Sequence, residues 1–415
     1  MAGPTTYFDP STAGALPERT RQLVERRARA MGSAYRLFYQ EPIEFVRGSG
    51  TKLYDADGNE YLDVYNNVPS VGHAHPRVAE AMAKQAATLT THTRYLAEPT
   101  IAYAEDLLST LPLSIDNVMF TCTGSEANDL ALRIAKYATG GTGVIVTKNA
   151  YHGITTEIAA ISPSLGGVES LPAWTKVVDA PDGEDLGVAV VTALFELLEA
   201  GIRPAALIVD TIFASDGVYP NVPGLNHAVA AIRAAGGLFI ADEVQPGFGR
   251  LGRTMWGFER YDLVPDLVTV GKPMGNGQPI AAVMASHQLI DQFNNHSRYF
   301  NTFGGSSVSI AAAQATLDVL RDEKLQKNAR KVGRYLREQL ATLDAFEEVR
   351  GAGLFIGAKL ESEERALAVV NALRERRVLL AASGAGNDTL KIRPPLPFSR
   401  DDADRLLTEL DAVLR

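Results

Sequence analysis

Between about residues 75 and 310, short apolar runs alternate with segments of helical periodicity. We expect strands over residues 117–122, 143–148, 205–210, 237–242, 267–271 and 281–285. A strand that is apolar at nearly every position is typical of a mostly parallel sheet that is covered by helices on both faces. Ligands of such sheets bind beyond the carboxyl ends of the strands. The residues that follow each run are therefore the first candidates for a functional site.

A lysine follows one of these strands on a glycine hinge. The run Leu267–Val270 leads into Gly271 and Lys272, and Pro273 comes next. An amine held in an apolar pocket has a lowered pKa and can attack a carbonyl to form an imine. The alternative is an ordinary surface lysine on a loop, and the other strand ends must decide between the two.

The strand over residues 117–122 leads into a helix with a well-marked start. Thr123 and Glu126 have the spacing of a capping box, which places Gly124 and Ser125 in the first turn. Free N–H groups and the helix dipole favour an anion at that position. The alternative is a well-capped helix without a ligand.

Other strand ends carry acids and aromatic side chains. Asp242 follows an apolar strand and needs a partner, for which a protonated heterocyclic nitrogen or an arginine would serve. Asp210 is a second acid on the same edge. Tyr151 and His152 can lie over a flat ring or pack as ordinary core residues, and Thr302 lies beside two glycines before a helix. An anion site, an acid, an aromatic cover and an imine-forming lysine are together the requirements of pyridoxal 5′-phosphate (PLP).

The 415 residues exceed what one small core needs, so we expect more than one domain. We assign residues 1–70 to an N-terminal arm and part of a small domain, 71–310 to a large domain, and 311–415 to a linking helix and the rest of the small domain. A hairpin is expected over 51–64, around Asp57 and Gly58, and a long helical segment over about 306–343.

Composition narrows the function classes. The net charge is −9 without a block of basic residues, which argues against a nucleic-acid partner. A single cysteine, Cys122, excludes a disulfide framework. We expect no membrane segment and no metal site, since His73 and His75 lack a third ligand and resemble turn residues. The first residues lack the features of a secretion signal, so a cytoplasmic location is expected.

Five segments carry a family resemblance: "GSEANDLALRIA", "AYHG", "IADEVQPGFGR", "GKPMGNGQPIAAV" and "NTFGGSSVS". With them the chain resembles the class III, fold-type I PLP enzymes, which include ω-amino aminotransferases. The resemblance implies an α/β fold with a large domain around a mostly parallel seven-stranded sheet. A small α+β domain would be built from both chain ends.

The resemblance also implies roles for single residues. Lys272 would be the Schiff-base lysine and Asp242 the partner of the pyridine nitrogen. Further cofactor contacts would come from a set of residues on the same edge: Gly124, Ser125, Tyr151, His152, Asp210, Val244 and Gln245. Thr302 would reach the cofactor phosphate of a neighbouring subunit, which implies a homodimer, with a tetramer also open.

A narrower likeness concerns the substrate. "RGAGLFIGAKL" and "RVLLAASGAGNDTLKIRPPLPFS" resemble the ethanolamine-phosphate phospho-lyases. Lys391 stands where related aminotransferases carry a carboxylate-binding arginine, and Asp210 and Thr211 stand where they have Glu-Pro. We therefore expect elimination of phosphate from O-phosphoethanolamine, with acetaldehyde, ammonia and phosphate as products. The candidate substrate residues are Lys391, Arg393, Arg77 and Asn67. The alternatives are an ω-aminotransferase that uses a keto acid, or a non-catalytic protein of the same fold.

Overall fold

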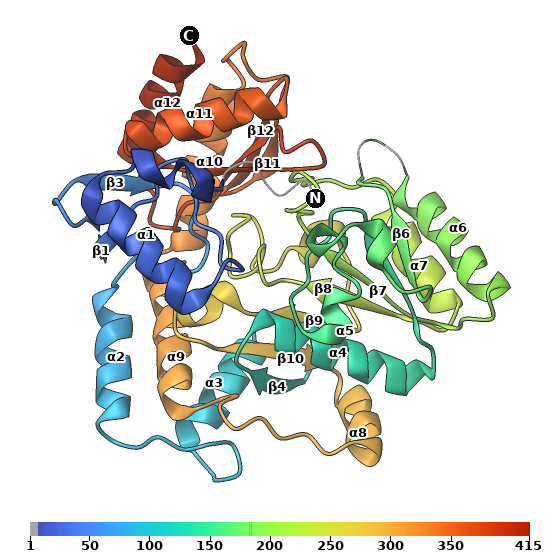
Figure 1. Cartoon of the computed structure of the whole chain (residues 1–415). Coiled ribbons are helices and arrows are strands. Elements are labelled where there is room, and N and C mark those ends of the chain that lie inside the picture. Colours follow the sequence, from blue (N-terminus) through green and yellow to red (C-terminus); the bar gives the residue numbers. More distant parts are fainter. Residues whose placement is uncertain (1–6, 182, 184) are drawn as a thin grey trace.

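The computed structural model describes residues 7–181, 183 and 185–415. Residues 1–6, which the sequence assigns to the N-terminal arm, lie outside the described residues. Figure 1 shows a lower part built around one large sheet and an upper part that carries the C-terminal helices. No helix in the described ranges has the length and apolar character that a membrane crossing requires.

Within the described residues, the large sheet has seven strands in the order β4-β10-β9-β8-β7-β5-β6. They are β4 (Asn117–Thr121), β5 (Gly143–Thr147), β6 (Thr175–Val178), β7 (Pro204–Asp210), β8 (Leu238–Asp242), β9 (Leu267–Val270) and β10 (Ala281–Ala285). β10 runs antiparallel to β4 and β9, whereas the other neighbours are parallel. The carboxyl ends of six of these strands therefore lie at one edge of the sheet. β6 was not among the strands expected from the apolar runs.

Alternate residues of the strands enter two separate cores. Val144 and Ile208 pack with α4 on one face, while Ile145 and Leu207 pack with α6 and α7 on the other. Full burial of such a side chain stabilises the fold by about 1.5–3 kcal/mol. The helices around the sheet are α4 (Gly124–Thr139), α5 (Thr156–Ala159), α6 (Leu186–Glu199), α7 (Leu225–Ala234) and α8 (His287–His296). The two cores explain why these strands have no polar face.

The upper part is built from both ends of the chain. The short strand β13 (Val378–Leu379) pairs in parallel with β3 (Glu60–Asp63), next to β2 (Lys52–Asp55) and β1 (Phe45–Ser49). A second sheet has the order β11-β12-β15-β14. Its strands and the helices around them are β11 (Glu348–Ala352), β12 (Phe355–Lys359), β14 (Ala381–Ser383), β15 (Thr389–Ile392), α10 (Leu325–Leu340), α11 (Glu363–Glu375) and α12 (Arg400–Leu414). A small α+β part from both chain ends is confirmed, whereas the exact boundaries at 70 and 310 stay a prediction.

The N-terminal region is more ordered than an arm. A 3-10 helix, η1 (Pro10–Ala15), precedes α1 (Glu18–Met31). Phe8 and Leu16 are buried, which ties this segment to the rest of the molecule. The expected hairpin is present, with β2 and β3 joined by a turn in which Gly58 has a φ of 82°.

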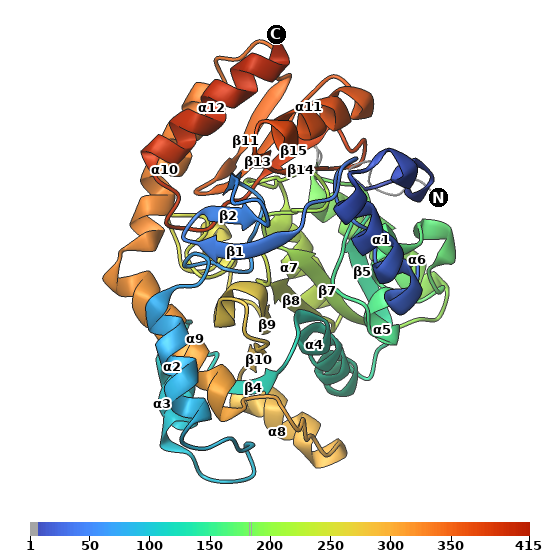
Figure 2. The ribbon, with the colours of Figure 1, turned by 60° about the vertical axis from the view of Figure 1, so that its left-hand side comes forward.

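The expected helical segment over 306–343 is broken in two. α9 (Ser307–Asp322) ends before Lys324, which has a φ of 55°, and α10 begins at Leu325. α9 packs along α2 (Pro76–Ala86) and α3 (Glu98–Leu108) in the lower part, and Figures 1 and 2 both show α2 beside it. α10 packs on β11 and α12 in the upper part, so the chain bends where it passes from one core to the other.

Candidate active site

A pocket opens at the carboxyl edge of the large sheet. It is lined by residues from the α4 start, the turn after β5, and the ends of β8 and β9, namely Gly124, Ser125, Asn128, Tyr151, His152, Gly153, Asp242, Val244, Gln245 and Lys272. Eight of these ten were candidates from the sequence, and Asn128 and Gly153 were not. The strand-end rule therefore located the pocket.

Asp242 ends β8 and is buried within a hydrogen-bond network. Its Oδ2 accepts a bond of 2.9 Å from the Asn128 amide and lies 2.8 Å from Nδ1 of His152. Its Oδ1 accepts from the backbone N–H of Val244 at 3.0 Å. This network fixes the orientation of the carboxylate at the pocket wall.

Asn128 was missed, although the sequence carried a signal for it. It lies on α4 three and seven residues before the buried Ala131 and Ala135, so it occupies the apolar face of the helix. There its Oδ1 accepts from Thr269 Oγ1 at 2.6 Å, while its amide also donates to the backbone oxygen of His152 at 2.7 Å. A polar residue on a buried helix face requires partners. Asn128 thus connects three strand ends.

His152 and Tyr151 differ in their surroundings. His152 is buried, and its Nδ1 contacts Asp242. This contact indicates that His152 orients the acid and does not cover a flat ring. Tyr151 lies at the pocket mouth and is 37% exposed, which leaves ring surface available. Partial burial, followed by nearby Tyr7 and Asp242, raises the Tyr151 pKa. Its hydroxyl therefore stays protonated at neutral pH.

The start of α4 has the expected capping box. Thr123 Oγ1 accepts from the Glu126 N–H at 3.1 Å, and Glu126 Oε2 accepts from the Thr123 N–H at 2.8 Å. Gly124 and Ser125 occupy the first helical positions, where N–H groups point out of the helix. A Cβ on Gly271 would lie 3.3 Å from the Gly124 backbone, so the lysine loop and this helix start approach closely. An anion at this helix start would be held beside Lys272.

Lys272 begins a 3-10 turn, η5 (Lys272–Gly275), directly after Gly271. Lys272 is exposed, and its side chain lines the pocket. Desolvation lowers the Lys272 pKa, Arg393 lowers it further, and Asp242 and Asp210 act in the opposite direction. The structure thus gives Lys272 the lowered pKa that an imine-forming amine requires.

Asp210 and Gln245 form the next layer. Asp210 ends β7 and accepts from the backbone N–H groups of Ile212 at 3.0 Å and Ala214 at 3.2 Å. Burial, and then the neighbouring Asp242, raise the Asp210 pKa to about 6. Gln245 donates to Asp210 Oδ2 at 3.3 Å, and its Oε1 accepts from Arg393. Gln245 thereby links Asp210 to Arg393.

Two cations of the upper part face this layer. Lys391 lies in β15, and desolvation, followed by repulsion from Arg393, lowers its pKa to about 7. Arg393 is buried and donates to the backbone oxygen of Tyr65 at 3.2 Å. Asn67 is also buried; its amide donates to the Gln245 backbone oxygen at 3.0 Å, and its Oδ1 has no hydrogen-bond partner among the described residues. These three candidate residues therefore lie next to the pocket.

Two candidates lie elsewhere on the chain. Arg77 forms an ion pair of 2.8 Å with Asp322 at the surface, where α2 meets α9, and does not line the pocket. This chain's pocket gives its assignment as a substrate residue no support, and the assignment stays a prediction. Thr302 lies exposed in the segment before α9, and its contact with a second subunit stays a prediction. His73 pairs with Asp63 at 2.6 Å and His75 with Glu323 at 3.0 Å.

Comparison with known proteins places this geometry in a family. Residues 38–414 match the model of the family described as "Aminotransferase class-III". The chain belongs to the class-III aminotransferase family. Class-III enzymes of this kind have PLP fold type I and depend on PLP, so the cofactor prediction is confirmed.

Relatives of this class-III enzyme bear two kinds of name. It is 37% identical to "Alanine--glyoxylate aminotransferase 2-like" of Drosophila melanogaster, over 93% of this chain and 85% of the relative. It is 35% identical to "Ethanolamine-phosphate phospho-lyase homolog 1" of Caenorhabditis elegans, over 99% and 97%. A solved phospholyase from Arthrobacter in complex with phosphoethanolamine is 40% identical, with a TM-score of 0.91 over 94% of this chain and 99% of that one.

The pocket of this class-III enzyme fits PLP. The open N–H groups of α4 suit the phosphate, and the carboxylate of Asp242 can accept a hydrogen bond from a protonated ring nitrogen. Lys272 is in place for covalent attachment. When bound, PLP acts as an electron sink for a carbanion. His152 and Asn128 orient the Asp242 carboxylate, which would hold that ring.

We predict that Lys272 carries the cofactor. Lys272→Ala should abolish the visible absorbance that depends on the covalent link, and should lower turnover by at least about 10²–10⁴-fold because the proton-transfer group is lost. PLP should still bind through the α4 site. Borohydride reduction and peptide mapping of the unmodified enzyme should place the pyridoxyl group on Lys272, and Lys391→Ala serves as a control that keeps the absorbance. A pyridoxyl group on another lysine would contradict the assignment.

Proposed function

We propose that this PLP-dependent enzyme is a phospho-lyase that eliminates phosphate from O-phosphoethanolamine. The observation that carries the proposal is the pair of cations, Lys391 and Arg393, placed next to Lys272. The two relatives whose printed names concern phosphoethanolamine support the same substrate. The products would be acetaldehyde, ammonia and inorganic phosphate.

The charges around Lys391 favour a dianion. Burial, and then repulsion from Arg393, lowers the pKa of Lys391 to about 7. A phosphate group between them would remove the repulsion and restore the charge of the lysine. Lysine is also a good point-charge ligand for phosphate, whereas it lacks the planar fork that binds a carboxylate through two bonds.

The elimination divides among the chain's own residues. Once the substrate amine has replaced it on the cofactor, Lys272 would remove the proton from the carbon that carries the amine. Asp242 would hold the ring of the bound cofactor, which supplies the electron sink. The carbon–oxygen bond then breaks with its electrons on the phosphate, where negative charge grows. Lys391 and Arg393 stabilise that charge, as preorganised cations do in other transition states. Water hydrolyses the released enamine to acetaldehyde and ammonia.

The rival function is that of an ω-aminotransferase with a keto-acid acceptor. It uses the same cofactor residues, and one relative has an aminotransferase name. The substrate side separates the two. A carboxylate substrate is best held by an arginine that is free to make two parallel bonds. Arg393 is instead engaged by Gln245 and by the Tyr65 backbone, and Lys391 cannot supply that geometry.

We predict turnover without an amino acceptor. With phosphoethanolamine alone, the holoenzyme should release many equivalents of phosphate and acetaldehyde per active site, because elimination returns the cofactor to its starting form. The measurement is a phosphate assay coupled to acetaldehyde detection. A single equivalent followed by arrest, with recovery when a keto acid is added, would instead favour the aminotransferase.

We predict that Lys391 binds the substrate phosphate and that its protonation controls the affinity. Sulfate remains a dianion near neutral pH, so its competitive inhibition constant should be flat below pH about 7 and should rise about tenfold per unit above it as Lys391 loses its proton. Lys391→Arg should remove this rise. Lys391→Glu should lower kcat/KM roughly 30- to 1000-fold, which corresponds to about 2–4 kcal/mol of lost transition-state stabilisation, and PLP binding should be unchanged. An identical rise of the constant in Lys391→Arg would assign the titration to another group.

We also propose that the enzyme works as a dimer in which Thr302 completes the cofactor site of the other subunit. Exposed apolar residues near it support this: Phe303 is 70% exposed, Tyr95 68% and Leu96 97%. Burying such surface between two copies would stabilise the assembly.

If Thr302 completes the neighbouring cofactor site, its removal should weaken PLP binding without breaking the dimer. Thr302→Ala should weaken PLP affinity roughly 10- to 150-fold, as removal of one hydrogen bond to a charged group does, and should leave the oligomeric mass unchanged. Equilibrium dialysis and sedimentation measure the two quantities. Ser306→Ala is the matched control, since it removes a hydroxyl from the same segment. A fully active monomer at assay concentration would refute the role of Thr302.

A further inference from the structure

A second hollow lies away from the PLP pocket, where α9 bends into α10. Its volume is about 490 Å³. The walls come from the end of α9, the first turns of α10, the loop before Met255 and the residue Thr110. The lining residues are Thr110, Gly252, Arg253, Met255, Leu320, Arg321, Lys324, Gln326, Lys327 and Arg330. We refer to this hollow as the basic pocket.

Five of the ten lining residues are cations and none is an acid. Arg321 is neutralised, because its NH1 group bonds both carboxylate oxygens of Asp106 at 2.7 and 2.9 Å. The side chains of the other four, Arg253, Lys324, Lys327 and Arg330, make no ion pair or hydrogen bond within the described part of the chain. They are concentrated in a protein whose net charge is −9. Unpaired like charges around one hollow repel each other and attract an anion.

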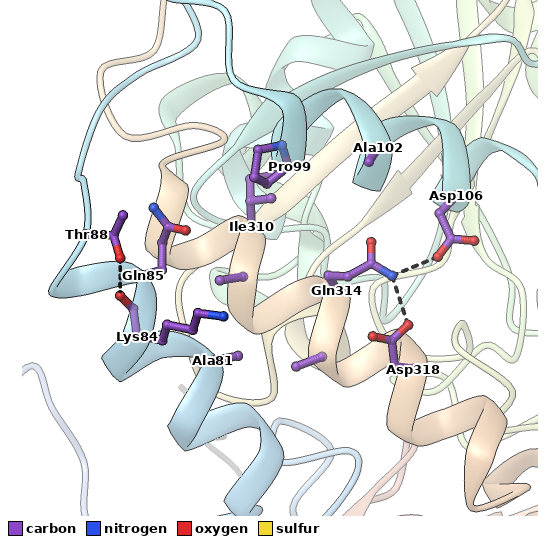
Figure 3. A pocket seen from close by; sticks show the side chains of 12 residues that line it. Ala81, Lys84, Gln85, Thr88, Pro99, Ala102, Asp106, Ile310, Gln314 and Asp318 are labelled. Carbon is purple, nitrogen blue, oxygen red and sulfur yellow. Dashed lines mark hydrogen bonds between the residues drawn. The ribbon is translucent and has the colours of Figure 1, made fainter.

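The neighbouring groove has the opposite character. Figure 3 shows Gln314 on α9 between Asp106 and Asp318, and its amide donates to both acids, at 2.8 and 2.9 Å. This groove is lined by two acids, one lysine and several alanines, so it offers no excess of positive charge. Asp106 lies between the two hollows and directs its charge to Arg321. Of these two hollows, the basic pocket is therefore the one with an excess of positive charge.

The sequence places cations where a helix start disfavours them. α10 begins at Leu325, its N-cap is Lys324, and its first turn contains no acid and no side-chain cap. The N-terminal end of a helix dipole is positive, so Lys324 and Lys327 there oppose the dipole. An anion in the basic pocket would be favoured by the side chains and by the dipole together. This arrangement lowers stability in the absence of such a ligand.

The walls of the basic pocket are held in place by close backbone packing. A Cβ on Gly252 would lie 2.7 Å from the Arg330 Cα, and a Cβ on Gly249 would lie 2.9 Å from the Gln326 Cβ. Both glycines also have positive φ, 79° and 72°. The loop that carries Arg253 is thus fixed against α10, and the cations of the two elements face one hollow before any ligand arrives. Preorganisation of this kind reduces the entropy cost of binding.

We propose that the basic pocket binds a small anion with two or more phosphate groups, at a site separate from the PLP pocket. Four unpaired cations exceed what one phosphate dianion neutralises, whereas a diphosphate matches them. Arginine and lysine supply complementary contacts, through two parallel bonds and as a point charge. Met255 and Leu320 add an apolar wall beside the charges.

The test uses the holoenzyme and calorimetric titration with inorganic pyrophosphate at fixed ionic strength. The variant is Lys327→Gln with Arg330→Gln, and the control is Lys331→Gln with Arg334→Gln. Both remove two charges from α10 with the same spacing, and the control pair does not line the basic pocket. We expect at least tenfold weaker binding in the variant and less than a twofold change in the control. PLP absorbance and thermal unfolding verify that both fold.

Two further titrants define the ligand class. Methyl phosphate should bind at least tenfold more weakly than pyrophosphate, since it carries a single phosphate group. A nucleoside diphosphate that binds as well as pyrophosphate, or better, identifies the nucleotide class, and one that binds more weakly identifies a compact diphosphate. Equal loss of affinity in variant and control would reduce the effect to net charge and would overturn the proposal. So would pyrophosphate affinity that the variant leaves unchanged.

Discussion

The buried carboxylate of Asp242 is the group on which the rest of the active site depends. It is oriented by His152 and Asn128 through Oδ2 and by a backbone N–H through Oδ1. A charge at the end of an apolar strand is expensive unless donors surround it. These donors come from the α4 helix and from the turn after β5, so both elements must be correctly packed on the sheet before the acid is in position. The cofactor site is therefore a product of the large core and not of a loop alone.

The second organising feature is the balance of acids and cations between the two parts of the molecule. Asp210 and Asp242 lie on the sheet edge, whereas Lys391 lies in β15 and Arg393 directly after it in the other part. Burial raises the pKa of Asp210 to about 6 and lowers that of Lys391 to about 7. Each charge is costly alone and each is stabilised by the group opposite. Buried groups of opposite charge thus lie where the two parts of the molecule meet.

Sequence reasoning located the strand ends because short apolar runs and the rule for ligands of parallel sheets are both local signals. Lys272, Asp242 and the start of α4 could be predicted in this way. Asn128 was not, since its role depends on Thr269 and Asp242, which are far away in the sequence and meet only in the folded sheet. The bend at Lys324 was also missed, because no glycine or proline marks it. Arg77 was a candidate as one of several cations, and in the fold it pairs with Asp322 on α9, far away in the sequence.

The pairing of β13 with β3 has a consequence for the order of synthesis. β3 ends at Asp63, and its parallel neighbour β13 is not complete until residue 379 has been made. By contrast, the strands of the large sheet all lie between residues 117 and 285. On the ribosome the middle of the protein can thus form its core while the N-terminal strands still wait for a neighbour. Contacts between such distant segments are slow to form and leave an unpaired strand edge exposed meanwhile. Completion of the C-terminal segment is then the step that closes the N-terminal sheet and brings Lys391 to the site.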